Sequence, residues 1–472
     1  QEDPETANRA TEQFTTIGGG GANSASVYGA TVGGGLDNEA ASQYATIGGG
    51  LHNVTSGGWV ATIGGGQQNA AVGYATVGGG AYNEALGGNA CIAGGYGNQA
   101  FDTDTTVSGG GHNTAGSDNG DPEDAPYATV GGGLSNDATD WGATVAGGVT
   151  NEASEAFSTV AGGFENVASG NASTIGGGRE NTASGDASTI AGGGPKAWDD
   201  PTPGNLATDN YATVSGGAEN VAGNNNTNKT DAEFATVGGG NMNVADGRQA
   251  TVGGGGGNHA GYRATVSGGL RNEASGSYST IPGGLDNLAE GNYSFAAGRN
   301  AYAYSSGSFV WADSTNAQFT GGASNSFAVR ANGGVWLVLN SDAQSWWRCY
   351  AESGSSWTCT SDRNQKEDLV VADGREVLDR LEEVPIYYWR GIGQETRHLG
   401  PMAQDFWAAY RVGDGDTSLA TIDLDGVSLA AIQGLYTLVQ EQEEKIQDLE
   451  ARMAAMEAAL AAMTTEGSDS GP

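Results

Sequence analysis

Apolar and polar positions alternate within one short phrase that is repeated along most of this chain. The phrase is Ala-Thr-Val-Gly-Gly-Gly, two variable residues and Asn, and it occurs about eighteen times between residues 14 and 313. Successive Thr residues stand 14 to 16 positions apart, except across three longer gaps. A fixed period of this length indicates a stack of similar coils rather than a globule.

Each copy predicts two short β-strands and two tight turns, which together make one coil of an all-β parallel β-solenoid. Within Ala-Thr-Val, the Thr and Val side chains point to opposite faces of the strand. We expect Val and Ile residues, such as Ile47 and Val77, to form the interior and the Thr row to form an outer or contact face. At a strand spacing of about 4.8 Å, about nineteen coils give a rod on the order of 90 Å long.

An Asn stands seven residues after each Thr, as in Asn38, Asn53 and Asn69. Stacked Asn side chains can form a hydrogen-bonded ladder along a fibre axis, and Asn also tolerates the left-handed conformation of turns. Both readings are structural, and we prefer them to ligand binding. The glycines permit positive φ and leave no Cβ to clash between coils.

The three longer gaps, at residues 113–127, 194–211 and 224–234, are rich in Pro, Asp, Asn and Gly. They predict loops that leave the rod at one edge. Insertions in a repeat often carry the binding face, and Trp198 is a candidate exposed aromatic residue. A tolerated surface insertion is the alternative for each loop.

Residues 314–360 have a different composition and predict a small β neck. Two apolar runs within residues 327–340 are joined by Asn-Gly, which favours a hairpin. Cys349 and Cys359 lie ten residues apart and are a candidate disulfide. Cys91, which takes the Thr place in one repeat, is left over, and we expect it to be buried as a small apolar residue.

The carboxyl-terminal third begins with residues 361–431, which predict a mixed α/β domain with a helix at 376–385 and a strand at 386–390. Residues 432–463 repeat apolar positions with 3-4 spacing, which predicts a coiled coil in which Gln442 is a polar core residue. A helix docked on its own domain is the alternative. We expect a loose leader at residues 1–13 and a disordered tail at residues 464–472.

Composition restricts the partners. The chain has 55 acidic and 19 basic residues, a formal net charge of −36. Without a basic stripe, nucleic acid is not an expected partner. The acidic excess favours solubility and also fits a salt-loving source. The calcium-binding nonapeptide of other β-rolls is missing. We expect no cofactor, no metal centre and no segment that crosses a membrane.

A thin coil with an interior of Ala, Val and Gly buries little apolar surface alone, so we expect a homo-oligomer with three-fold closure. The repeats resemble the head domain of trimeric autotransporter adhesins, most clearly at residues 293–313, which begin Tyr-Ser-Phe-Ala-Ala-Gly-Arg-Asn-Ala-Tyr-Ala-Tyr. The resemblance covers residues 14–313. It implies a trimeric, left-handed parallel β-roll.

One constellation suggests a reaction. Ser361 and Lys366 stand in Ser-Asp-Arg-Asn-Gln-Lys, and a neutral Lys amine can activate a hydroxyl nucleophile. A spacing of five does not place both side chains on one helix face, so the pair needs a strand or turn. A Ser that caps a helix is the alternative.

The residues that follow extend this motif. The Ser-Asp-x-x-x-Lys opening, the His-x-Gly…Ala-Gln segment at residues 398–404 and the Asp-Leu-Asp-Gly-Val run at 423–427 resemble the intramolecular chaperone domain of endosialidase tail spikes and other phage tail fibres. The resemblance covers residues 361–463. It implies a trimeric assembly domain in which Ser361 attacks the carbonyl of Thr360, Lys366 is the general base, and the Thr360–Ser361 bond is cut. His398 and Gln404 have no assigned role and are expected to be buried structural residues.

The sequence therefore predicts a homotrimeric extracellular fibre, on a cell surface or a virion tail, that binds a surface receptor or glycan. A glycan-degrading tail spike is an alternative. It would need paired carboxylates in a cleft, whereas the solenoid repeats single Glu residues after Asn, at Glu39, Glu84, Glu152 and Glu273. A flat Thr face that binds ice or a mineral lattice is a third possibility.

Overall fold

The computed structural model describes residues 7–338, 348–351, 357–359 and 361–466. These residues fall into two compact units, a solenoid and a carboxyl-terminal unit, which are treated separately.

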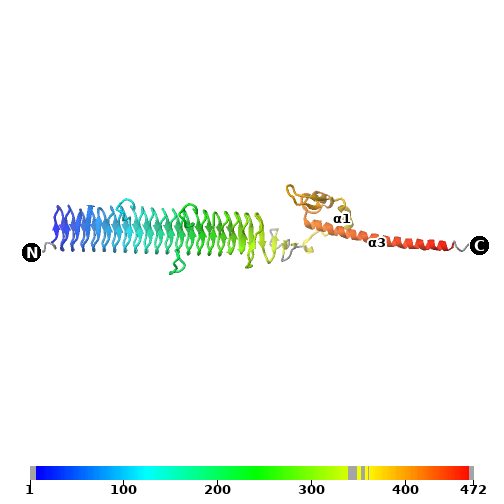
Figure 1. Ribbon diagram of the computed structural model, residues 1–472, viewed down its shortest axis with the longest axis horizontal. Coiled ribbons are helices and arrows are strands. Elements are labelled where there is room, and N and C mark those ends of the chain that lie inside the picture. Colours follow the sequence, from blue (N-terminus) through cyan, green and yellow to red (C-terminus); the bar gives the residue numbers. More distant parts are fainter. Residues whose placement is uncertain (1–6, 339–347, 352–356, 360, 467–472) are drawn as a thin grey trace, which may run out of the picture. The chain divides into compact units, whose positions relative to one another are not determined.

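The first unit is a parallel β-solenoid of about 21 turns (Figure 1). Each turn contributes one short strand to each of two long sheets. In an early coil these are β3 (Ser24–Ala25) and β4 (Thr31–Val32), and in the next they are β5 (Glu39–Gln43) and β6 (Thr46–Ile47). Adjacent strands are parallel and in register, with Thr31 opposite Thr46. The predicted solenoid is confirmed.

The interior is formed as the alternation predicts. The Val and Ile residues of the repeat are completely buried, as at Ile47 and Val77, and so are the Ala residues that flank them. Thr31 and Thr46 face outward on the same strands. Cys91 lies in this outward row and is only partly covered, so the expected burial of Cys91 is wrong. The reason is its position, because a residue in the Thr place points away from the core.

The Asn row forms a continuous ladder inside the solenoid. The side-chain amide of Asn53 donates to Asn38 Oδ1 at 3.0 Å and to the carbonyls of Gly49 and Gly66. Asn38 Oδ1 also accepts the backbone N–H of Asn53 at 3.1 Å. Each fully buried Asn thus satisfies its own polar atoms and ties its coil to its neighbours, which agrees with the structural interpretation.

Glycine is required most strictly at the third position of the triplet. Gly80 has φ +91°, and a Cβ there would lie 2.1 Å from the carbonyl oxygen of Gly95 in the next coil. At Gly79, its neighbour, a Cβ would make only an ordinary van der Waals contact, 4.0 Å from the Gly65 carbonyl oxygen. The triplet is therefore not uniformly constrained.

The insertions leave the solenoid at two edges, not at one as expected (Figure 1). The first and third interrupt the turn that joins a strand of one sheet to the next strand of the other sheet. They follow β15 (Thr114–Ala115) and β27 (Val221–Ala222). The second follows the glycine corner after β24 (Thr189–Ile190), before β25 (Leu206–Ala207). The place of each insertion within the repeat decides which edge it occupies.

The solenoid extends beyond the predicted range, from β1 (Arg9–Ala10) to β41 (Phe327–Arg330). Among the described residues, the hairpin expected within residues 327–340 is not formed: β41 pairs in parallel with β39 (Phe309–Ala312), and β42 (Val335–Val338) belongs to another sheet.

Two contacts favour continuation of the solenoid at this end. The Phe327 and Phe309 rings stack with their centroids 4.8 Å apart. Asp313 accepts hydrogen bonds from the Asn332 backbone at 2.8 Å and from Arg330 Nε at 3.1 Å. The Asn332 N–H and the neighbouring Thr315 groups lower the pKa of Asp313 to about 2. The Asn-Gly turn is thus held against Asp313.

A three-stranded sheet follows, with the order β42 (Val335–Val338), β43 (Arg348–Ala351) and β44 (Trp357–Cys359). The carboxyl-terminal unit then contains a 3₁₀ turn, η1 (Arg363–Gln365), and the helices α1 (Gly374–Leu381) and α2 (Ala403–Tyr410). The strands β45 (Ile386–Trp389) and β46 (His398–Pro401) pair as an antiparallel hairpin.

The long helix α3 (Thr421–Glu466) begins eleven residues before the predicted start at residue 432. Its early turns cross α1 where two glycines meet, and a Cβ on Gly434 would lie 2.0 Å from the Gly374 carbonyl oxygen. By length and composition alone, α3 is apolar enough to cross a membrane, contrary to our expectation. A single helix of this kind is weak evidence, and heptad spacing accounts for its apolar residues.

Candidate functional site

The Ser361 and Lys366 side chains meet across η1. Lys366 Nζ donates a hydrogen bond of 2.6 Å to Ser361 Oγ. The residues that flank the turn, Asp362 and Lys366, have extended backbones, with φ −76° and −122°. A three-residue turn between extended residues brings positions five apart together, as the predicted pair requires.

The cap of this turn is Asp362 rather than Ser361. Asp362 Oδ1 accepts the Asn364 backbone N–H at 3.0 Å and its side-chain amide at 3.1 Å. The alternative in which Ser361 caps a helix is therefore not what the chain adopts. Ser361 does not cap the turn, and its hydroxyl faces the Lys366 amine.

Both members of the pair are exposed in the single chain. A lysine acts as a general base only in its neutral form, which requires burial or a nearby cation. An isolated chain supplies little burial at this site. Thr360, which carries the carbonyl of the expected cleavage bond, lies outside the described residues.

His398 and Gln404 are exposed, so the expected burial of both is wrong for the single chain. His398 pairs with Trp389 across the β45–β46 hairpin, and the two rings lie 4.6 Å apart. Gln404 lies in the first turn of α2. Within the described residues, neither forms a hydrogen bond or ring contact with Ser361 or Lys366.

The expected disulfide is not tested. Cys349 lies in β43 and Cys359 in β44, which are neighbours in the three-stranded sheet. Their side chains lie outside the described part of the structure, so the bond stays a prediction.

The carboxyl-terminal unit presents a long apolar surface. The apolar residues that recur with heptad spacing along α3 are called its seam. They are exposed, for example 53% at Ile446, 54% at Leu449 and 61% at Met453. One side of the amino-terminal part of α3 packs against α1, where Ala431 is buried and Arg375 of α1 forms an ion pair of 3.4 Å with Glu441. The apolar residues on the other side of this part, such as Ile432 and Leu435, are exposed like those further along the helix.

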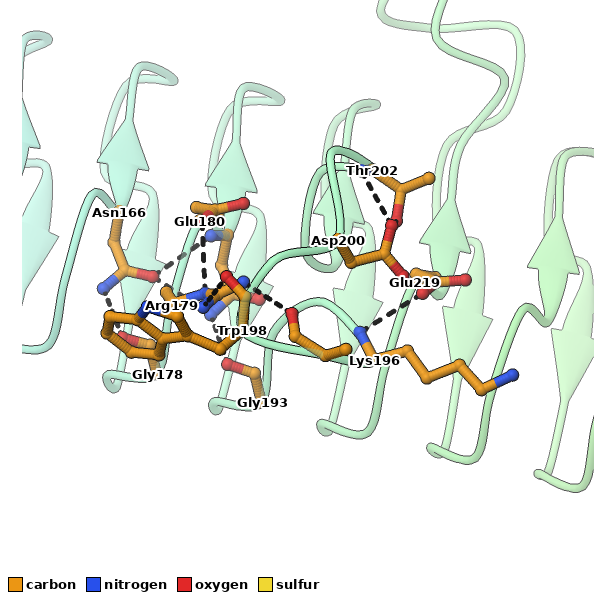
Figure 2. Close-up of polar contacts among 12 residues, drawn as sticks. Asn166, Gly178, Arg179, Glu180, Gly193, Lys196, Trp198, Asp200, Thr202 and Glu219 are labelled. Carbon is orange, nitrogen blue, oxygen red and sulfur yellow. Dashed lines mark hydrogen bonds and ion pairs between the residues drawn. The ribbon is translucent and has the colours of Figure 1, made fainter.

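The second insertion carries the exposed Trp198 predicted from the sequence, which is 78% exposed. Figure 2 shows its indole beside Arg179, whose guanidinium lies 4.5 Å from the ring centroid. Arg179 also donates to the carbonyls of Trp198 and Ala197, each at 2.7 Å. Lys196 is directed away from the ring, and its backbone N–H bonds to Glu219 at 3.2 Å (Figure 2). The loop therefore holds one aromatic face outward.

The Glu row after Asn lies on the outer face of one sheet. Glu39, for instance, is exposed and faces Val54 in the next coil. Asp137 and Glu152 are in-register neighbours, and burial is the main cause that raises the pKa of Asp137. This pair lies on a sheet face. Sequence reasoning missed one further polar cluster, around the buried Asp102, because a single Asp in a varied turn gives no periodic signal.

Comparison with known proteins places Ser361 and Lys366 in a segment that matches a known family. No curated protein matches the chain. Residues 361–412, which contain Ser361, Lys366 and the β45–β46 hairpin, match the model of the family Peptidase_S74, described as "Chaperone of endosialidase".

Proposed function

We propose that this chain forms a homotrimeric extracellular fibre, resembling a tail fibre or adhesin, whose carboxyl-terminal domain directs assembly and then cuts itself off. The observation that carries the proposal is the 2.6 Å contact between Lys366 Nζ and Ser361 Oγ inside the segment that matches the chaperone family. The location, on a cell surface or a virion tail, follows from the same family and is part of the proposal.

The exposed seam of α3 supports assembly. Its apolar residues are about half exposed or more, which is costly in water unless copies of the helix cover them. Heptad spacing suits a parallel bundle of identical helices. These residues include Ile432, Leu435, Val439, Ile446, Leu449, Met453 and Met456.

The repeat itself explains why an assembly domain is useful. Coils with nearly identical Thr, Val and Asn rows can pair with a sister chain in several registers at similar free energy. Helices that associate first would raise the local concentration of the solenoids and align their ends. Removal of the helices afterwards would make the assembled state kinetically irreversible.

The chemistry of the cut can be written with this chain's own groups. Ser361 Oγ attacks the carbonyl carbon of Thr360 while its proton moves to the Lys366 amine. The Thr360–Ser361 amide bond breaks, its nitrogen gains a proton, and an ester links the two residues. Water then hydrolyses the ester, which leaves a Thr360 carboxylate and restores the Ser361 hydroxyl. Assembly would supply the burial that the general base requires.

The test is expression of the full chain and of Ser361→Ala. The parent should give two fragments on a denaturing gel, divided between residues 360 and 361, and Ser361→Ala should give only the full-length chain. Ser418→Ala, at an exposed serine of the same unit, is the matched control and should be cut like the parent. Equal cleavage of the parent and Ser361→Ala would contradict the proposal.

Trp198 supports a receptor-binding role for the solenoid. An exposed indole that Arg179 holds in place costs little entropy to use as a stacking surface for a sugar ring or another receptor group. Screening the assembled fibre and its Trp198→Ala variant against surface glycans tests this role. Trp59→Ala, at another exposed tryptophan, is the control. Equal binding by the parent and Trp198→Ala would contradict it.

A further inference from the structure

The first and third insertions are attached to the solenoid by the same device, although their sequences differ. A fully buried Asp follows a strand in the preceding coil, at Asp102 for the first loop and at Asp209 for the third. Asp102 Oδ2 accepts the Ser117 N–H at 2.5 Å, and Asp209 Oδ2 accepts the Asn224 N–H at 2.9 Å.

The backbone contacts of the two loops correspond as well. The Thr103 N–H donates to the Pro122 carbonyl at 2.9 Å, and the Asn210 N–H donates to the Lys229 carbonyl, also at 2.9 Å. A glycine precedes the first residue of each loop, at Gly116 and Gly223, and a Cβ there would collide with the Asp carboxylate. The two loops are therefore a matched pair within one molecule.

They differ in how the buried carboxylate is satisfied. In the third loop, Asp209 Oδ1 accepts the Ala232 N–H at 3.3 Å. Asp231 beside it accepts amide donors from Asn224 and Asn226, each at 2.8 Å. Both oxygens of Asp209 and both oxygens of Asp231 thus accept a hydrogen bond from a neutral N–H group.

The first loop keeps an amide donor, because Asn119 donates to the Asp124 carboxylate, but among the described residues it lacks a counterpart of the Ala232 N–H. Asp102 Oδ1 is buried and has no hydrogen-bond partner among the described residues. The Asp124 carboxyl lies within hydrogen-bonding reach of Asp102, and Asp121 adds further negative charge. Burial, followed by the proximity of Asp124 and Asp121, raises the pKa of Asp102. Two carboxyl groups that approach with an oxygen left unpaired are stabilised either by a shared proton or by a bound cation.

The surroundings suit a cation. Asp102 lines a pocket of about 270 Å³ together with Ser117, Asp118, Gly120 and Asp121. Within the described ranges, no three His, Cys, Asp or Glu side chains lie together as a set that could hold a metal ion. A cation here would therefore combine two carboxylates with backbone oxygens and water, an irregular set that calcium accepts more readily than magnesium does.

We propose that the first insertion is a calcium site in which Asp102 and Asp124 supply the carboxylate ligands and residues 117–122 supply further oxygens. Such a partly hydrated site binds weakly, with a Kd on the order of 10⁻⁴–10⁻³ M, as in extracellular calcium modules. Calcium would order this loop, and the third loop would hold its shape without it. The inference is independent of assembly and cleavage.

Hydrogen exchange on the full chain tests the proposal, because the third loop is an internal control. In 10 mM CaCl2, peptides that cover residues 117–126 should exchange about fivefold more slowly than in NaCl of equal ionic strength. Peptides that cover residues 224–233 should not change, and MgCl2 should have a smaller effect than CaCl2. Equal responses of the two loops, or equal responses to CaCl2 and NaCl, would overturn the proposal.

Two matched variants complete the test. Asp124 is exposed, so Asp124→Asn leaves the core intact and should abolish the calcium response. Asp231→Asn, at the corresponding carboxylate of the third loop, should leave it unchanged. A loop that becomes ordered on acidification alone, with no response to calcium, would show that a proton joins Asp102 and Asp124, and the calcium proposal would be wrong.

Discussion

Lys366 Nζ donates to Ser361 Oγ at 2.6 Å, although the two residues lie five apart and share no helix face. The contact depends on Asp362, which caps the short turn between them and accepts the Asn364 N–H at 3.0 Å. A hydroxyl and an amine are thus held together at the first residues of the segment that matches the chaperone family.

The first prediction concerns the role of Lys366. If its amine is the general base, Lys366→Arg should abolish cleavage, because a guanidinium does not lose its proton in proteins. Arg363→Lys, in the same turn, should be cut normally. Time courses on denaturing gels measure this, and a Lys366→Arg variant that is cut at the parent's rate would exclude the role.

The second prediction concerns the seam of α3. Leu449→Asp places a charge on the seam and should prevent both association and cleavage, because the proposed burial of the reactive pair depends on assembly. Ala451→Asp, on the opposite side of the helix, should have no effect on either. Sedimentation velocity and a denaturing gel report the two outcomes separately. An unassembled Leu449→Asp chain that is still cut would separate cleavage from assembly.

The third prediction compares adjacent glycines of one triplet. Gly80→Ala should destabilise its coil by about 1–3 kcal/mol, the usual range for overpacking, because the Cβ meets the Gly95 carbonyl. Gly79→Ala should be close to neutral, since its Cβ would lie 4.0 Å from the Gly65 carbonyl oxygen, an ordinary van der Waals contact. Hydrogen exchange in the neighbouring strands measures the local difference. Equal effects would mean that the coils are spaced more loosely than described.

The fourth prediction concerns pH. His259 Nε2 lies 2.8 Å from Asp246 Oδ1, and this hydrogen bond is the main cause that raises the pKa of His259, with Glu273 contributing. Because the folded pKa exceeds the unfolded value of about 6.5, the added stability is fully present below about pH 6.5. It is lost as pH rises through the folded pKa.

Local hydrogen exchange, corrected for intrinsic rates, should therefore show the coil of His259 more protected at pH 6 than at pH 8.5. His259→Gln should remove this difference, and Asp246→Asn should reduce it. A difference that persists in His259→Gln would assign the effect to other groups.

The sequence predicts the parts of the fold that repeat. Val77 and Ile47 are inside, the Thr row is outside, and the Asn residues form a ladder, because each role recurs with the period of the coil. The Ser361–Lys366 pair was also predictable, since its motif is contiguous. The failures depend on contacts that a local pattern does not contain. Asp313 and Phe309 draw residues 327–330 into the solenoid, although Asn-Gly favours a hairpin there.

Other features follow from position rather than residue type. Cys91 is partly exposed because it occupies the outward place of a Thr. The insertions occupy two edges because they interrupt different corners of the coil. The Asp102 cluster escaped prediction because its meaning depends on a comparison with Asp209, which lies 107 residues further along the chain.

The mass of the freshly expressed full chain, measured under native and then denaturing conditions, tests the central claim most directly. We expect a native species that contains three copies of the solenoid, and two fragments per chain on denaturation, divided between residues 360 and 361. A monomer of intact chains under both conditions would contradict both the assembly and the self-cleavage that we propose.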